Sequence, residues 1–306
     1  MNLILILFNF LIFPGFLFTA VTGMLASWLD RKVTARIQWR KGPPWYQSFA
    51  DFVKLLGKET ILPQGAKWTF LLAPLLGLAS ITVVATLIGL TMINPKISFL
   101  GDLIVVIYLL IIPSLAVIMG GAASANPLAS VGISREIKLV LSYELPFILA
   151  ILVPIIKTGG AIKIGEIIRY QISQGSVWFS LSGSLALFVA IICMQAKLGI
   201  VPFDMAEADQ EIMAGPFIEY SGPSLAMFKL TRWMMLIWLP LFLIGLFWSF
   251  SYNIFWIILK YVALLVIIIL IKNTNPRLRI DQAMRFFWGP MTLIAIIAVV
   301  LALFGK

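Results

Sequence analysis

The sequence has no histidine and a single cysteine, Cys193, among its 306 residues. Haem inside a helical bundle is normally held by axial histidines, and an iron–sulfur cluster needs several cysteine ligands. Zinc sites need cysteine and histidine in groups. The residues for such sites are missing, so we expect this chain to hold no cofactor and no metal. Any electron transfer that involves the protein must then take place in a partner.

Charged residues are also scarce. They make up 12% of the chain and hydrophobic residues 61%, whereas roughly 25% of a soluble protein is charged. This composition is typical of an integral membrane protein. The first apolar run, residues 3–28, has no basic residue before it and is long enough to span, so we expect a retained helix rather than a cleaved signal peptide. Cys193 lies in another apolar run and is predicted to be a buried core residue.

Eight apolar runs are separated by polar or Pro/Gly-rich segments. They cover residues 3–28, 69–93, 99–121, 139–156, 177–197, 223–248, 252–271 and 286–305. Each run is long enough to cross a bilayer as a helix, and none alternates as a membrane strand would. The sequence therefore predicts an all-α polytopic membrane protein with about eight transmembrane helices in one membrane domain, residues 1–306. It shows no convincing internal repeat, which disfavours an inverted-repeat transporter.

Lysine and arginine fall unevenly on the two sides of the predicted bundle. Lys260 lies within a run, and most of the other basic residues fall on one side. Those on the opposite side are Lys96, Lys157, Lys163, Arg169 and Lys306. Because basic loops stay in the cytoplasm, we expect a multi-pass protein of the cell membrane with large cytoplasmic loops and both termini outside. The net charge of +10 then reflects topology, and no nucleic-acid partner is needed.

The segment after the first run is strongly basic. Gly42 and Pro43 break any helix there, and residues of about 45–59 then show an apolar stripe opposite a polar one. This pattern predicts an amphipathic helix in the membrane interface. An acid followed by three arginines suggests specific ion pairs or a docking surface, although a simple positive-inside anchor is the alternative. These residues are Asp30, Arg31, Arg36 and Arg40.

A second polar segment, residues 200–222, is acidic and is predicted to be a cytoplasmic loop. Its carboxylates are Asp204, Glu207, Asp209, Glu211 and Glu219. Their spacing predicts that Asp204, Glu207 and Glu211 share one helical face. Crowded carboxylates repel, so some are expected to hold protons near neutral pH and to titrate as a group. Interleaved apolar residues favour a partly buried acidic funnel over a solvated loop.

Glu144 is the only charged residue in the apolar run 139–156. An ionised carboxylate in a membrane costs roughly 2.5–3.5 kcal/mol, so we expect it to serve a proton or ion pathway, with Pro146 admitting water nearby. The alternative is a pair formed for packing, with Lys229 or Arg232 as the candidate partner. Asp102 and Glu166 read as ordinary acids at loop edges on the other side.

The polar segments contain longer motifs in a fixed order along nearly the whole chain. They are Asp30-Arg31-Lys32 to Gly42-Pro43, Ala50-Asp51 to Lys58-Glu59, Arg135-Glu136, Ser142-Tyr143-Glu144-Leu145-Pro146, Pro202-Phe203-Asp204, Glu219-Tyr220-Ser221-Gly222 and Arg279-Ile280-Asp281-Gln282. This series resembles the membrane anchor subunit that respiratory complex I (the H-subunit family of NADH-quinone oxidoreductase) shares with energy-converting membrane-bound NiFe hydrogenases. The resemblance agrees with the helical fold predicted above.

Some features depart from quinone-reducing members of that family. Asp30 stands where glutamate is usual, and the stretch between Gly42-Pro43 and Ala50-Asp51 is several residues shorter and lacks their glycine-rich character. Residues 126–136 look more like the hydrogenase branch. The resemblance therefore favours a hydrogenase-type complex, and the short loop puts a quinone pocket in doubt.

The resemblance implies a peripheral arm, docked on the cytoplasmic face, that holds iron–sulfur clusters and, in the hydrogenase branch, a NiFe site. The implied partners are hydrogenase-like large and small subunits, ferredoxin reached through them, and antiporter-like membrane subunits in the lipid bilayer. The docking residues that it implies are Asp30, Arg31, Arg36, Arg40, Asp51, Lys54, Arg135, Glu136, Arg279 and Asp281. The predicted proton or ion pathway comprises Glu144, Asp204, Glu207, Asp209, Glu211, Glu219, Lys229 and Arg232.

The function expected from this resemblance is coupling: redox chemistry in the docked arm drives proton or sodium translocation through the membrane part. A quinone- or sulfur-reducing relative of complex I would use the chain in the same way. Two readings of other classes remain. A stand-alone secondary transporter would use Glu144 as its coupling acid, and a purely structural anchor would use the charged residues for stability only.

Overall fold

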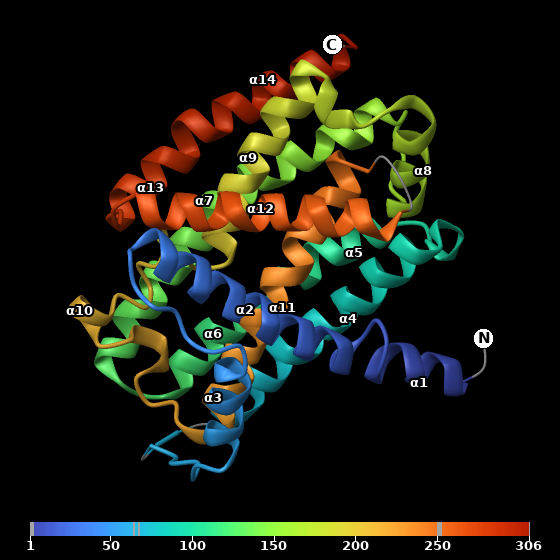
Figure 1. Cartoon of the computed structure of the whole chain (residues 1–306). Helices are drawn as coiled ribbons and strands as arrows, with labels where there is room; N and C mark the ends of the chain where they lie inside the picture. The colour runs from blue at the N-terminus through green and yellow to red at the C-terminus, as the bar shows by residue number, and fades with distance from the viewer. Residues whose placement is uncertain (1–2, 64, 67, 250–252, 306) are drawn as a thin grey trace.

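The computed structural model describes residues 3–63, 65–66, 68–249 and 253–305. Lys306 and Lys67, one of the basic residues on the predicted cytoplasmic side, lie outside these residues. The described chain contains helices and no strands, as Figure 1 shows, so the predicted all-α class is confirmed. The longer helices are α2 (Phe16–Ile37), α4 (Thr69–Ile93), α7 (Pro127–Lys157), α11 (Gly222–Phe247) and α12 (Ile254–Thr274).

Shorter helices complete the bundle. The α-helices are α1 (Leu3–Leu11), α3 (Gln47–Leu56), α5 (Asp102–Leu109), α6 (Ile112–Ala123), α8 (Ile164–Gln174), α9 (Leu181–Lys197), α10 (Asp209–Ile212), α13 (Ile280–Phe286) and α14 (Thr292–Leu303). Three short 3₁₀ turns and one π-helical segment join them: η1 (Pro95–Ile97), η2 (Val177–Phe179), η3 (Gly215–Phe217) and the π segment η4 (Phe287–Met291).

Seven helical stretches of the described chain are long and apolar enough to cross a membrane. They are Ile4–Ile37, Thr69–Ile93, Asp102–Ala123, Pro127–Lys157, Gly222–Phe247, Ile254–Thr274 and Ile280–Leu303. The shorter apolar helix α9 corresponds to the remaining predicted run. The chain is therefore a polytopic membrane protein, and its predicted runs all recur as helices.

Helix α11 lies in the middle of the bundle and packs against α2 and α4 (Figure 1). Gly23 allows α2 to approach closely, because a Cβ atom there would lie 2.9 Å from the carbonyl carbon and oxygen of Trp233. Trp238 donates its indole N–H to the Thr19 hydroxyl at 3.0 Å and joins the same two helices. This contact places the charged end of α2 beside the start of α11.

Two predicted helices are interrupted and one is longer than predicted. Pro14 and Gly15 separate α1 from α2, and Pro113 lies in the first turn of α6 after the break that follows α5. Helix α7 begins at Pro127, which suits a first turn because proline has no N–H to leave unpaired. It continues through Pro146 to Lys157, so the helix contains the predicted run 139–156 and begins well before it.

Asp102 is not the loop-edge acid that the sequence suggested. It is buried, accepts the Ile164 amide at 2.9 Å and the Ser98 hydroxyl at 2.7 Å, and so satisfies a backbone donor at the start of α8. Helix α8 itself was not predicted. Glu166, in its first turn, pairs with Lys163 at 3.0 Å and stays partly exposed, as expected.

The amphipathic helix predicted at about 45–59 is present as the shorter α3. Phe49 and Phe52 from its apolar stripe pack against the core, and Asp51 from its polar side pairs with Arg31 at 2.9 Å. Val53, from the same apolar stripe, is exposed. Helix α3 therefore packs on α2 and α11 with part of its surface and leaves the rest uncovered.

Candidate functional site

Two cavities lie side by side where α2, α11 and the segment after α9 meet. The first, of about 390 Å³, is lined largely by apolar side chains of α6, α11 and residues 206–217, together with Glu136, Lys197 and Lys229. The second, of about 320 Å³, is lined by charged residues. These residues are Asp30, Arg31, Asp204, Glu207, Arg232, Lys272 and Arg277.

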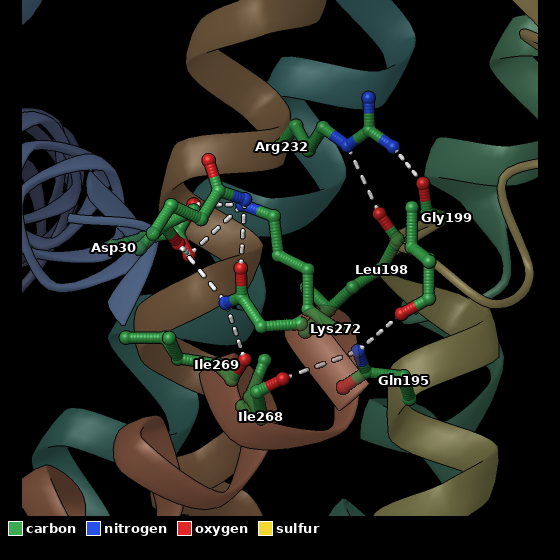
Figure 2. A network of polar contacts seen from close by, with 12 residues as sticks. Asp30, Gln195, Leu198, Gly199, Arg232, Ile268, Ile269 and Lys272 are labelled. Carbon is green, nitrogen blue, oxygen red and sulfur yellow. Dashed lines mark hydrogen bonds and ion pairs between the residues drawn. The ribbon is translucent and has the colours of Figure 1, made fainter. Parts of the chain in front are cut away.

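The ion pair between Arg232 and Glu207 lines both cavities and stands between them. The guanidinium donates to both carboxylate oxygens of Glu207, at 2.7 and 2.8 Å. It also donates to the carbonyl of Leu198 at 2.9 Å and to that of Gly199, as Figure 2 shows. Since arginine presents several donors in a fixed plane, these contacts fix Arg232 to the end of α9 and leave Glu207 as its partner from the acidic loop.

The end of α2 is joined to α12 by a second ion pair. Lys272 donates to both oxygens of Asp30, at 3.0 and 2.8 Å (Figure 2), and both residues line the second cavity together with Arg232. Gln195 is buried and donates to the carbonyls of Val201 and Ile268, at 2.8 and 3.4 Å. Gln195 therefore ties the start of the acidic loop to α12.

Asp204 enters the second cavity from the acidic loop. It pairs with Arg277 at 2.7 Å, and its side chain is 11% exposed. Its Oδ1 atom is buried and has no hydrogen-bond partner within the part of the chain that the structure describes. Burial raises the pKa of Asp204 above its ordinary value, and this effect outweighs the opposing charge of Arg277. Asp204 is therefore a carboxylate that holds a proton more readily than usual.

The other acidic-loop residues are spread over separate partners. Glu211 pairs with Arg135 at 2.6 Å, and Glu219 accepts the Asn126 side-chain amide at 2.6 Å. Asp209 begins α10, and its side chain lies outside the described part. The prediction that Asp204, Glu207 and Glu211 share a helical face was wrong, because residues 200–208 are not helical. Proline and the turn that follows α9 break the helical register there.

Glu144 pairs with Lys197 at 2.8 Å, with side-chain exposures of 15% and 0%. The prediction of Lys229 or Arg232 as partner was wrong. Helix α7 packs against α9, which brings the last residue of α9 to Glu144, whereas Arg232 is taken by Glu207 and Lys229 lies at the exposed surface beside the first cavity.

The Lys197 ammonium also lies 5.1 and 4.8 Å from the ring centres of Tyr143 and Phe147. Such cation–π contacts stabilise a buried cation. The remaining Glu144 oxygen, Oε1, is buried without a hydrogen-bond partner among the described residues. A carboxylate with one such unpaired oxygen is a good acceptor for a proton or a water molecule.

The predicted docking residues do not form one compact site. Arg31 and Asp51 pair with each other, and Arg135 holds Glu211. Burial alone would raise the pKa of Asp51, but hydrogen bonds from Arg31 and Gln47 and the nearby positive charges together lower it. Glu136 lines the first cavity. Asp30 pairs with Lys272. The other five members lie exposed at the surface: Arg36, Arg40, Lys54, Arg279 and Asp281.

Four residues of the site were missed as functional candidates. Lys272, Arg277 and Lys197 belong to the basic residues on the predicted cytoplasmic side and had no further predicted role, and Gln195 had none. The sequence did offer a sign that Lys197 has a partner. It is a basic residue at the end of the apolar run 177–197, where a side chain can reach an acid on a neighbouring helix. Gln195, two residues earlier in the same run, is a polar group in a membrane helix and such groups need partners.

Comparison with known proteins defines the family of this chain. The family model for NADH dehydrogenase matches residues 9–303. The chain belongs to the NADH dehydrogenase family. Its relatives include the H subunit of NADH-quinone oxidoreductase from Dehalococcoides mccartyi strain CBDB1, which is 34% identical over 89% of this chain and 79% of the relative. The equivalent protein from Syntrophotalea carbinolica is 34% identical over 94% of this chain and 92% of the relative.

A solved structure also resembles this member of the NADH dehydrogenase family over its full length. A chain of the membrane-bound sulfane sulfur reductase, an archaeal respiratory membrane complex, matches with a TM-score of 0.88 and 29% identity. The match covers 97% of this chain and 99% of the other. The resemblance drawn from the sequence motifs is thus confirmed, and the protein is a complex I-like membrane subunit of an oxidoreductase.

Proposed function

We propose that the chain is the cofactor-free anchor and coupling subunit of a hydrogenase-type respiratory complex. In this proposal a peripheral arm with hydrogenase-like large and small subunits docks over the acidic loop, and antiporter-like subunits lie beside the helices in the cell membrane. Redox chemistry in the arm, fed by ferredoxin, changes the charge of the acidic loop. That change reaches Glu144 and drives proton or sodium translocation.

One observation carries the proposal: charged residues line two adjoining cavities that lead from the acidic loop to the Glu144–Lys197 pair. Asp204 and Glu207 line the second cavity, and the pair Glu207–Arg232 also lines the first. Lys197 lines the first cavity and pairs with Glu144. Because charged groups that line adjoining cavities act on one another, a change of charge at one end alters the proton affinity of its neighbours.

Glu144→Gln tests this coupling in the whole complex, reconstituted in vesicles. We expect the redox activity of the arm to be retained and ion uptake to fall to the level without substrate, because glutamine cannot exchange a proton. Ion uptake and electron transfer are measured on the same vesicles. The matched control is Glu166→Gln, at a partly exposed pair with Lys163, which should pump normally.

Glu144→Gln also deprives Lys197 of its counter-charge, which could weaken folding. The double variant Glu144→Gln/Lys197→Met removes both groups and is expected to fold, to keep the redox activity and to lose pumping. Full pumping by either variant would overturn the coupling role. A change in stability alone would support the structural anchor instead, and pumping by the isolated chain would support a secondary transporter.

A sulfur-reducing complex is the second candidate, favoured by the structural match to the membrane-bound sulfane sulfur reductase. Metal analysis of the complex isolated through this chain separates the two. Nickel with abundant iron would support the hydrogenase arm. Iron without nickel would support the sulfur-reducing candidate or a quinone-reducing relative. Neither metal, with the chain purified alone, would contradict both.

A further inference from the structure

Trp39 combines two features that are each uncommon. Its side chain is 98% exposed, although the indole is one of the largest apolar groups in proteins. Its backbone has a φ of +58°, in the left-handed region that glycine and asparagine adopt more readily. A bulky residue held in this conformation costs stability, and such strain is concentrated at functional sites. The exposed indole adds no packing to the fold, and glycine would adopt the same backbone conformation at lower cost.

The turn that carries Trp39 is fixed in place. Arg40 donates its amide to the carbonyl of Ala35 at 2.7 Å, which closes the end of α2 with Trp39 at the position where glycine is usual. The chain then folds back along α2. Trp28 donates its indole N–H to the Pro43 carbonyl at 3.2 Å, and Gly42 lies so close to Lys32 that a Cβ atom would meet its side chain at 2.8 Å. Trp39 therefore lies at the tip of a preorganised loop.

The lipid bilayer does not cover the Trp39 side chain. Helix α2 carries its first charged residue at Asp30 and ends at Ile37, a rise of about 10 Å at ~1.5 Å per residue. The headgroup layer of one leaflet is only about 5–7 Å thick. A helix that leaves the hydrocarbon at Asp30 thus holds Trp39 beyond the headgroups, whereas Trp28 is placed for the interfacial position that tryptophan favours.

Three basic residues lie close to Trp39 in the sequence. Arg36, Arg40 and Lys41 are exposed, and none of them forms an ion pair with a described residue. An exposed aromatic with arginine beside it is the composition of interface residues that contribute most to binding, because indole fills a pocket and arginine pairs with carboxylates at its rim. The charges also favour association with an acidic surface and make it sensitive to salt.

We propose that Trp39 anchors a soluble protein subunit on this face. The partner offers an apolar pocket that takes the indole, with carboxylates around it that pair with Arg36, Arg40 and Lys41. This inference rests on the proposed function only in requiring a docked subunit. It names the residue through which docking is held and the chemistry of the partner surface.

Trp39→Gly is a selective test, because glycine removes the indole and at the same time adopts the left-handed conformation without strain. The complex is isolated through a tag on this chain, and retention of the soluble subunits is measured as salt rises. We expect affinity for them to fall about 30-fold or more, while the thermal stability of the chain is unchanged or higher. Retention equal to that of the parent would overturn the proposal.

Trp68→Ala is the matched control. Trp68 is 84% exposed and immediately precedes the span Thr69–Ile93, where an interfacial tryptophan is expected. Its loss should leave retention unchanged. Equal losses in the two variants would overturn the proposal, since any exposed tryptophan would then act alike.

A photoreactive benzoylphenylalanine in place of Trp39 identifies the occupant directly in native membranes. A cross-link to a polypeptide supports the proposal, and cross-links to lipid alone overturn it. The outcome is separable from that of the coupling test. If position 39 contacts only lipid while Glu144→Gln still abolishes pumping, the docking inference fails and the coupling function stands.

Discussion

Lys197 brings its ammonium group to 2.8 Å from Glu144, in a place where both side chains are largely shielded from water. Breaking a buried pair by removing one partner is much more costly than replacing both, because the remaining charge has no compensation. The two residues should therefore be treated as a unit. This dependence gives a test of the pair that requires no knowledge of the partner subunits.

Lys197→Met should lower the free energy of unfolding by about 3–5 kcal/mol, since it leaves Glu144 buried without a cation. The measurement is denaturant or thermal unfolding of the chain in mild detergent. Adding Glu144→Gln should restore most of the lost stability. If the double variant were no more stable than the single one, the pair would not be the cause.

The contributions of Asp204 and Asp51 to the stability of the fold should change with pH in opposite directions. Burial raises the pKa of Asp204 above 3.8, so the folded protein binds this proton more tightly than the unfolded chain does, and the group destabilises the fold as pH rises through its raised pKa. Hydrogen bonds lower the pKa of Asp51 below 3.8. Its contribution is present above 3.8 and is lost as pH falls through its lowered pKa.

The midpoint of thermal unfolding of Asp204→Asn and Asp51→Asn, each compared with the parent across acid and neutral pH, measures this difference. Relative to the parent, Asp204→Asn should become more stable as pH rises, and Asp51→Asn less stable. The effect at Asp51 should be the smaller, because that side chain is 33% exposed and solvent screens its interactions. The same trend in both variants would refute the assignment.

At the scale of elements, the contact between α2 and α11 sets the position of the second cavity. Both helices supply its lining, with Asp30 from α2 and Arg232 from α11. Gly23 permits their close approach. A larger residue there must push the helices apart or distort their backbones, and overpacking of this kind typically costs 1–3 kcal/mol.

Gly23→Val should therefore lower the thermal stability of the chain, through a loss of about 1–3 kcal/mol. Gly289→Ala is the control, because a Cβ atom at Gly289 meets no neighbour within 4 Å and should be tolerated. Unfolding in detergent measures both. A Gly23→Val chain as stable as the parent would mean that α2 is not held tightly against α11.

Much of the element scale could be predicted from the sequence, because a membrane span is specified locally by the length and polarity of its own residues. Element ends were less predictable. Helix α7 extends well before its apolar run, since Asn126 accepts the Leu128 amide at 2.8 Å and starts the helix in a polar segment. The short α8 depends on Asp102, which is distant in sequence and reaches it only in the folded protein.

At the scale of the whole molecule, the sequence motifs predicted the family, and several of the residues they contain do line the two cavities. The pairing of charges could not be predicted, because it depends on which helices are neighbours. Glu144 was expected near α11 and instead meets α9. Leu198 and Gly199 bind Arg232 through their backbone carbonyls. Every residue has such a carbonyl, so the side-chain pattern of a sequence cannot indicate this role.

The Glu144–Lys197 pair also sets a condition on biogenesis. The two residues are separated by 53 positions, so Glu144 leaves the ribosome well before its counter-charge is made. An ionised carboxylate that entered lipid alone would cost about 2.5–3.5 kcal/mol on translocon scales. Helix α7 must therefore stay beside the translocon, or carry Glu144 protonated, until α9 has been synthesised. The two helices then partition into the bilayer together, as a hairpin whose charges are already neutralised.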